Sequence, residues 1–214
     1  MPDGSKIKNI VFDLGVVLFN LEYELTVEAF KTLGVDNHEE LFSEAGQLML
    51  FDRFERGEIE VPEFLAGMQS LIPGETTDQS IIDAWNAMLL DFPQSSINLL
   101  EALRPHYQLY LLSNTNDLHY ARFHEIIKEQ HGLDGLDEYF VGLYYSHNEG
   151  MRKPEPAFYK RLLEQEELNP TETVFIDDMN RNVQSAENVG IRGILLTRGM
   201  MATDLFDEEL KLLS

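Results

Sequence analysis

Short, uninterrupted apolar runs recur along the chain, and each is followed by polar residues. Four such runs predict strands: Ile10–Phe12, Tyr107–Leu112, Thr173–Ile176 and Gly193–Leu196. Runs that are apolar at every position are typical of parallel strands, because helices cover both faces of such a sheet. The pattern therefore predicts a parallel sheet.

Helical periodicity fills the segments between these runs. We predict helices over Ser95–Leu103, Pro156–Gln165 and Asn180–Val189. Strands that alternate with helices predict an α/β fold with a Rossmann-like, three-layer parallel sheet core. Ligands bind at the carboxyl ends of the strands in open sheets of this kind. After the last strand, four apolar residues indicate a helix that docks on the core, namely Leu205, Phe206, Leu210 and Leu213.

Residues 20–92 break this rhythm, because they show helical periodicity and no convincing strand. Two apolar stripes stand out, one of Phe64, Leu65 and Met68, the other of Ile81, Ile82, Trp85, Met88 and Leu89. We predict that residues 20–92 form a small helical cap inserted after the first strand. Residues 1–19 and 93–214 would then form the catalytic core.

The chain is strongly acidic, with 38 Asp and Glu against 16 Lys and Arg and a formal charge of −22. A field of that sign repels nucleic acids and anionic membrane surfaces, so neither is an expected partner. A phosphorylated ligand would need locally concentrated positive charge, from a bound cation or a placed lysine. The absence of cysteine excludes disulfides, thiolate metal sites and thiol catalysis.

The apolar segment Ile7–Phe19 contains Lys8, Asn9 and Asp13, and it is too short and too polar to span a bilayer. It also lacks the small-residue cleavage site of a signal peptide. We therefore expect a cytoplasmic protein. The sequence leaves the oligomeric state open, and a monomer is compatible with it.

Polar residues that follow the predicted strands are candidates for chemistry. Asp13 directly follows the first strand, where a carboxylate either caps the next segment or acts as a nucleophile toward phosphorus. Ser113 and Asn114 follow the second strand, where they form either a simple turn or a site for phosphate oxygens.

Lys153 and a pair of aspartates complete this set. Lys153 precedes Pro154, which biases the lysine toward extended backbone; it is either a solvated loop residue or an ammonium aimed at a fixed point. Asp177 and Asp178 follow the third predicted strand, where their simplest role is to cap the next helix.

Taken together, the three aspartates indicate a metal site. If Asp13, Asp177 and Asp178 gather at adjacent strand ends, each pair repels by about 3 kcal/mol at about 5 Å and an effective dielectric near 20. A divalent cation among them would remove this cost. Ligands that offer only oxygen favour Mg²⁺ over zinc.

Four segments resemble, in order, the four motifs of the haloacid dehalogenase superfamily: Phe12–Val17, Leu111–Asn116, Met151–Glu155 and Val174–Asp178. The resemblance covers the core from about residue 8 to 198. The first two motifs are also similar to those of small-capped sugar phosphatases, including the glucose-1-phosphate phosphatase type. The cap segment Arg56–Ile59 is similar to these proteins as well.

The resemblance implies a Mg²⁺-dependent phosphohydrolase that acts on a small phosphorylated metabolite, a sugar phosphate in particular. Asp13 would be the nucleophile and form an aspartyl phosphate. Ser113 and Asn114 would bind the phosphoryl oxygens, and Lys153 would neutralise charge on the nucleophile and the phosphate.

The resemblance also implies a metal ligand set. Mg²⁺ would be held by Asp13, by the backbone carbonyl of Gly15 and by Asp178, with Asp177 binding directly or through water. The arrangement would leave catalysis to positioning and electrostatics, as phosphoryl transfer requires.

Gly15 departs from the family pattern, because most phosphatases of this superfamily carry a general acid–base aspartate there. Loss of a general acid costs about 10²–10⁴-fold in rate for a poor leaving group. His147 and Glu22 are candidate replacements, although each also fits an ordinary loop residue. Two other functions stay open: a non-catalytic phospholigand-binding or regulatory module, which Gly15 favours, and a 2-haloacid dehalogenase, which Asp177 and Asp178 argue against.

Substrate recognition is expected from the cap. Asn20 and Tyr23, just after the first motif, are the better candidates to face the substrate. Arg53 and Arg56 could also face a substrate, but surface arginines of a helical cap usually face water, and we expect the same of these two.

Overall fold

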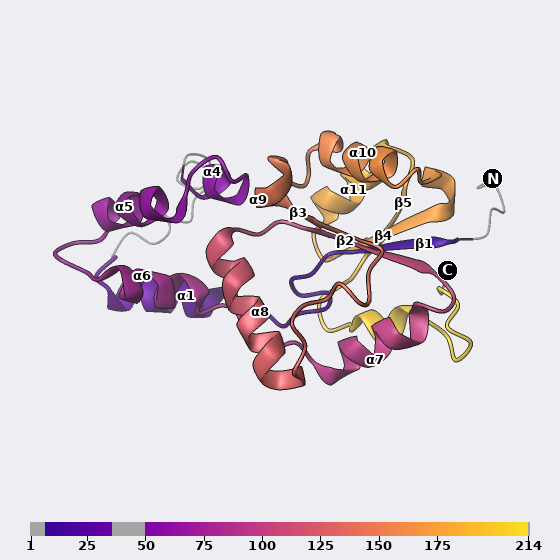
Figure 1. Ribbon diagram of the computed structural model, residues 1–214, viewed down its shortest axis with the longest axis horizontal. Helices are drawn as coiled ribbons and strands as arrows, with labels where there is room; N and C mark the ends of the chain where they lie inside the picture. Colours follow the sequence, from indigo (N-terminus) through magenta and orange to yellow (C-terminus); the bar gives the residue numbers. More distant parts are fainter. Residues whose placement is uncertain (1–6, 36–49, 214) are drawn as a thin grey trace.

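A five-stranded parallel sheet forms the centre of the protein in the computed structural model, which describes residues 7–35 and 50–213. The strand order is β3-β2-β1-β4-β5 (Figure 1). The strands are β1 (Asn9–Phe12), β2 (Gln108–Ser113), β3 (Gly142–Tyr145), β4 (Thr173–Asp177) and β5 (Arg192–Leu195). The parallel α/β fold predicted from the sequence is confirmed.

Helices cover both faces of the sheet and make it the middle of three layers. Ile10 and Phe12 of β1 pack into the cluster that α7 (Gln94–Leu103) and α8 (Asp117–His131) share. Val11, between them, packs on the opposite face against α10 (Pro156–Gln165) and α11 (Asn180–Asn188). Side chains alternate across a strand, so two buried faces account for the unbroken apolar run.

The register brings the functional segments to one edge of the sheet. Phe12 pairs with Leu111 of β2 and with Ile176 of β4. The backbone N–H of Asp13 donates to the carbonyl of Ile176 at 2.9 Å. The residues that follow β1, β2 and β4 therefore meet at the carboxyl ends of adjacent strands. The short helix α9 (Ser146–Glu149) follows β3 at the same edge.

The described part of residues 20–92 contains α1 (Tyr23–Thr32), α4 (Phe51–Glu55), α5 (Val61–Leu71) and α6 (Asp78–Asn86). These helices project together from one end of the sheet layer (Figure 1). They share a hydrophobic cluster separate from the two sheet clusters. Phe64 stacks on Phe54 with ring centroids 4.2 Å apart, and Trp85 lies 4.9 Å from Phe51. The helical insertion thus has a core of its own.

Two features differ from the sequence-based expectations. The strand β3 (Gly142–Tyr145) was not predicted; it is a four-residue edge strand, and only its last two residues are buried. The C-terminal segment does not form the expected helix: a 3-10 helix covers Ala202–Leu205 (η2), and the chain then turns. The Asp207 carboxylate accepts from the backbone N–H groups of Glu209 and Lys211, and such local bonds compete with helix formation.

Leu205 and Phe206 are nevertheless buried on the core, whereas Leu213 is half exposed. Another 3-10 helix, η1 (Pro170–Glu172), precedes β4. Among the described helices, none combines the length and the apolar character that crossing a bilayer requires.

The aromatic cluster of the helical insertion generates a stability prediction. Phe64→Ala removes a fully buried ring, so we expect the free energy of unfolding to fall by about 3–5 kcal/mol. Urea unfolding followed by the fluorescence of Trp85, the single tryptophan, measures the change. Leu71→Ala on the same helix is the control. Because the Leu71 side chain is half exposed, this substitution should lower the free energy of unfolding by less than about 0.5 kcal/mol. Equal losses in the two variants would contradict the assignment of this core.

Candidate functional site

Three carboxylates converge at the carboxyl edge of the sheet. Ligand oxygens of Asp13, Asp177 and Asp178 lie within 4.8 Å of one another. Asp177 is fully buried, and the other two are partly buried. Burial raises the pKa of Asp178, and the neighbouring Asp177 raises it further. The sequence-based expectation that these residues gather therefore agrees with the geometry.

A buried lysine bridges two of these carboxylates. The Nζ atom of Lys153 lies 2.7 Å from Asp13 Oδ1 and 2.7 Å from Asp177 Oδ2. The lysine is only 1% exposed. Burial opposes its charge, but the two carboxylates outweigh this effect and raise the pKa of Lys153 above its ordinary value. The ammonium is therefore protonated at neutral pH.

The charge balance of the cluster suits a divalent cation. Burial raises the pKa of Asp13 to about 7, while Lys153 opposes the rise and Asp177 adds to it. One ammonium against three carboxylates leaves two uncompensated negative charges when all four groups are ionised. A hard divalent cation accepts such oxygen ligands and supplies the missing charge. The donor set therefore fits Mg²⁺.

Hydrogen bonds to Asp177 and Asp13 hold the cluster in place. Asp177 Oδ1 accepts from the backbone N–H of Met179 at 2.7 Å, and both its oxygens accept from Asn182 Nδ2 at 3.0 Å. Asp13 Oδ1 accepts from the backbone N–H of Leu14 at 2.7 Å as well as from Lys153. Among the described residues, Asp13 Oδ2 has no hydrogen-bond donor and is the oxygen free to react or to bind a cation.

The side chain of Asn114 holds the backbone of Lys153. Its Nδ2 donates to the Lys153 carbonyl at 2.9 Å, and its Oδ1 accepts from the Lys153 N–H at 2.8 Å. Sequence reasoning assigned this residue to phosphoryl oxygens and missed the clamp, which only the fold reveals. The backbone N–H of Asn114 is the group left to a ligand. Ser113 is buried beside it at the end of β2, with its hydroxyl at the same edge.

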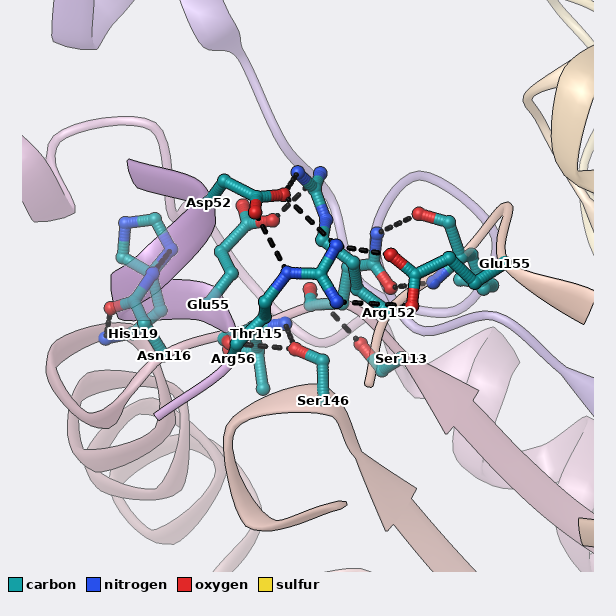
Figure 2. A network of polar contacts seen from close by, with 12 residues as sticks. Asp52, Glu55, Arg56, Ser113, Thr115, Asn116, His119, Ser146, Arg152 and Glu155 are labelled. Atoms are coloured by element: carbon teal, nitrogen blue, oxygen red, sulfur yellow. Dashed lines mark hydrogen bonds and ion pairs between the residues drawn. The ribbon is translucent and has the colours of Figure 1, made fainter. Parts of the chain in front are cut away.

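Thr115 and Asn116, the next two residues of the chain, connect this edge of the sheet to neighbouring elements (Figure 2). The Thr115 N–H donates to Ser146 Oγ, and that hydroxyl donates to the Thr115 carbonyl, both at 2.9 Å. Asn116 caps α8 by accepting from the His119 N–H at 3.1 Å, and it accepts from Trp85 Nε1 at 3.2 Å. The second motif is thereby tied both to the start of α9 and to the helical insertion.

Gly15 lies against the side chain of Leu21. A Cβ atom at this position would lie 2.6 Å from Leu21 Cδ1. An aspartate at position 15 would therefore need Leu21 to move. The next residue, Val16, adopts a φ of 64°, a costly conformation for a β-branched residue that holds the tight loop after the strand.

The two replacements considered for the missing acid lie elsewhere. His147 packs against the rings of Tyr120 and Tyr145, and its Nε2 is 3.7 Å from Asp117. Burial lowers its pKa, so the imidazole is neutral at pH 7. Glu22 is exposed to solvent. Neither forms a hydrogen bond or ion pair with Asp13.

Two groups from the helical insertion lie within electrostatic range of the site. Tyr23 is 56% exposed; desolvation of its phenol raises its pKa, and the charges of Asp13, Asp178 and Glu55 raise it further. Burial likewise raises the pKa of Glu55, on α4. Tyr23 had been expected to face the substrate, and its phenol lies within electrostatic range of the site. Sequence periodicity carried no signal for Glu55.

The remaining candidates take other positions. Asn20 donates from Nδ2 to Asp91 Oδ1 at 3.0 Å, at the junction between the insertion and the core. Arg53 is half exposed, as expected, with its nearest acid Glu58 at 3.8 Å. Arg56 does not face water: it is mostly buried in a cluster of ion pairs (Figure 2).

Comparison with known families and proteins places this geometry among hydrolases. The model of the family described as haloacid dehalogenase-like hydrolase matches residues 7–190. A D-ribitol-5-phosphate phosphatase from Bacteroides thetaiotaomicron is 30% identical over 186 residues, covering 86% of this chain and 89% of the relative. A sesquiterpene phosphatase from Aspergillus oryzae is 29% identical over 196 residues, covering 90% and 91%.

Solved structures give the same picture. A HAD family enzyme from Bacteroides thetaiotaomicron superposes with a TM-score of 0.88 at 36% identity, covering 95% of this chain and 100% of that one. The same enzyme in complex with magnesium and inorganic phosphate gives a TM-score of 0.83 at 36% identity, covering 94% and 100%.

The carboxylate cluster generates a metal-binding prediction. Mg²⁺ at 100 times its Kd should add about 2.7 kcal/mol of stability. For a chain of this size the gain raises Tm by about 5–10 °C. In Asp178→Asn, which removes one charged ligand, we expect less than about half of this Tm shift at the same Mg²⁺ concentration. Thermal unfolding with and without Mg²⁺ measures both.

Asp83→Asn is the matched control, because it removes the same charge from an exposed position on α6. Its Mg²⁺-dependent shift should equal that of the wild type. A full shift in Asp178→Asn would contradict the proposed ligand set.

Proposed function

The chain belongs to the haloacid dehalogenase-like hydrolase family, and from this premise we propose that it is a Mg²⁺-dependent phosphatase of a small phosphorylated metabolite. Its nucleophile would be Asp13. The observation that supports this proposal most is the buried Lys153 ammonium bridging Asp13 and Asp177 beside Asp178. In a cluster of this kind the ammonium orients one carboxylate and can pair with a phosphoryl group, while a bound divalent cation would offset the remaining negative charge.

The proposed reaction has two displacements at phosphorus. Oδ2 of Asp13 forms a bond to phosphorus while the bond from phosphorus to the leaving oxygen breaks, which gives an aspartyl phosphate and an alkoxide. The alkoxide takes a proton from solvent and leaves as the alcohol. Water then forms a bond to phosphorus and releases a proton to solvent, and the bond from phosphorus to Asp13 breaks. Inorganic phosphate leaves, and the carboxylate is regenerated.

The surrounding groups would stabilise the phosphoryl charge. The Lys153 ammonium lies where it can pair with a phosphoryl oxygen while it holds Asp13. The Ser113 hydroxyl and the Asn114 backbone N–H would donate to the other oxygens. Fixed donors of this kind act strongly because they need no rearrangement during the reaction.

Mg²⁺ would be held by Asp13, Asp178 and the Gly15 carbonyl, with Asp177 contributing directly or through water. When bound, it would offset the negative charge of the carboxylates and of the incoming phosphate. Asp177 is already engaged by Lys153, Met179 and Asn182, which favours a water-mediated contact for this residue.

The substrate we propose is a phosphate ester of a sugar or sugar alcohol. The D-ribitol-5-phosphate phosphatase among the relatives supports this class, and a HAD family neighbour binds magnesium and phosphate. Residues 20–92 would act as the cap that selects the substrate, because Tyr23 from this segment lies within electrostatic range of Asp13 and Glu55 within range of Lys153.

The deciding experiment replaces the nucleophile. Phosphate release is measured from an aryl phosphate, a hexose 1-phosphate and ribitol 5-phosphate, with Mg²⁺ and with a chelator. We expect Mg²⁺-dependent release by the wild type and a loss of at least about 10³-fold in Asp13→Asn, because no other group can form the covalent intermediate. Asp83→Asn, an exposed change of the same type, should keep full activity.

Each other result favours a different function. Unchanged release by Asp13→Asn would refute the mechanism. Tight binding of a phosphorylated metabolite without turnover would favour a regulatory module. Release of chloride from a 2-haloacid without added metal would favour a dehalogenase.

A further inference from the structure

The cap helix α4 is ion-paired to the loop that carries Lys153 (Figure 2). Arg56, just after the helix, donates from Nη1 to Glu155 Oε2 at 3.0 Å, and its Nη2 contacts the other oxygen of the same carboxylate. The pairing is therefore of the two-pronged kind that fixes geometry as well as charge. Glu155 lies two residues after Lys153.

The residue on the other side of Lys153 is paired to the same helix. Arg152 donates from Nη1 to Asp52 Oδ1 at 2.6 Å, and its Nη2 lies 2.8 Å from Glu55 Oε2. Asp52 also accepts from Arg56 Nε at 2.7 Å. One carboxylate thus joins both arginines, and a single charged cluster spans the two chain segments.

Backbone contact reinforces this docking. Gly57 follows Arg56, and a Cβ atom there would lie 2.2 Å from the backbone carbonyl oxygen of His147. The cap backbone therefore touches the segment that leads from α9 into the lysine loop. The opposite side of the cap joins the core through paired backbone at residues 20–22 and 88–91, where the chain crosses between the two parts.

The two junctions between cap and core are held in different ways. At residues 20–22 and 88–91 the chain itself runs from the core into the cap and back. At α4, by contrast, charged side chains hold the cap against the core. Ion pairs between two bodies have a small net free energy, because desolvation offsets their attraction. The α4 junction can therefore separate and reform. Asp13 is only 13% exposed and Lys153 1%, which leaves little room for a metabolite to enter while the cap is docked.

The lysine loop is also held from the core. Asn114 clamps the backbone of Lys153, and Ser185 Oγ donates to the carbonyl of Pro154. If these core contacts alone fix the position of Lys153, the cap has no influence on it. The cap contacts flank the same residue at positions −1 and +2, so they act on the same few backbone torsions.

We propose that Arg56 is a positioning residue for the phosphatase reaction proposed above, holding Lys153 through Glu155 so that its ammonium is fully placed only when α4 is docked. When the cap docks, the same contacts place the Lys153 ammonium and so complete the catalytic site. The lysine reaches both carboxylates when substrate is enclosed, and it is less restrained when the site is open.

The test compares two arginines of one cap helix region. In Arg56→Gln, we expect kcat to fall about 10- to 100-fold and KM to change less than about threefold. The reason is that displacing a catalytic group such as the Lys153 ammonium by about 1 Å slows the chemical step by about this factor. In Arg53→Gln, which removes the same charge from a half-exposed side chain, both constants should stay at wild-type values. Circular dichroism and Tm confirm that each variant is folded at the assay temperature.

Amide hydrogen exchange of residues 150–156 gives a readout independent of activity. The Lys153 N–H is protected by Asn114 Oδ1, so loosening of the loop should speed its exchange in Arg56→Gln and leave it unchanged in Arg53→Gln. Arg56→Lys should recover part of both effects. The double variant Arg56→Gln/Glu155→Gln should be no slower than the slower single variant, because both act through one contact.

Several results would overturn the inference. The first is an unchanged kcat in Arg56→Gln. The second is a reduced kcat in Arg56→Gln with unchanged hydrogen exchange of the Lys153 N–H. The third is a kcat in the double variant that falls by the product of the two single-variant factors. If Arg56→Gln does not fold, Glu155→Gln carries the same test. If the wild type releases no phosphate, the proposed function fails, and the exchange of Lys153 alone decides whether the cap restrains the loop.

Discussion

The buried ammonium of Lys153 is the constraint on which the rest of the site depends. A charge that is 1% exposed is tolerated only with close partners of opposite sign, and Asp13 and Asp177 provide them at 2.7 Å. Removing one partner from a buried pair costs about 3–5 kcal/mol, because the other charge stays uncompensated. The strand order follows this need, since β1 and β4 must be neighbours for both aspartates to reach one lysine.

The cluster is electrostatically incomplete, and this links it to the composition of the whole chain. The formal charge of −22 disfavours anionic ligands at long range. At the sheet edge, however, Lys153 and a divalent cation would concentrate positive charge on the side where three carboxylates meet. An acidic protein can thus select a phosphate at one point while its surface repels polyanions. The low apolar content of the α4 junction belongs to the same pattern, because its contacts are also charge pairs.

Sequence reasoning succeeded where local pattern and chemistry coincide. The central strands β1, β2 and β4 are almost entirely buried, so they were detectable as apolar runs, with boundaries shifted by about one residue. The edge strand β5 was detected as well, although none of its residues is fully buried. The other edge strand, β3, was missed, although Gly142–Tyr145 lies in an apolar and aromatic run. Asp13, Asp177 and Asp178 were singled out because they follow predicted strands, and Lys153 because it precedes Pro154; the structure brings the four side chains together.

What could not be predicted depends on side-chain geometry between distant segments. The clamp of Asn114 on Lys153 joins residues 39 positions apart, and the Arg56–Glu155 pair joins residues 99 apart. Neither periodicity nor spacing encodes such contacts. The surface role expected for Arg56 was wrong for this reason: a helical wheel shows which face a residue takes, and it does not show what packs against that face.

The glycine at position 15 lies next to the point where the cap is attached. Leu21, whose side chain occupies the space a Cβ atom would need, forms an antiparallel bridge with Leu89 where the two crossing chains meet. An aspartate at position 15 would have to displace the end of the Leu21 side chain. Without an acid at position 15, the leaving group would take its proton from the substrate, from water or from a cap group. Tyr23 is within electrostatic range of Asp13, and Glu55 of Lys153, which makes these two residues the candidate proton donors from the cap.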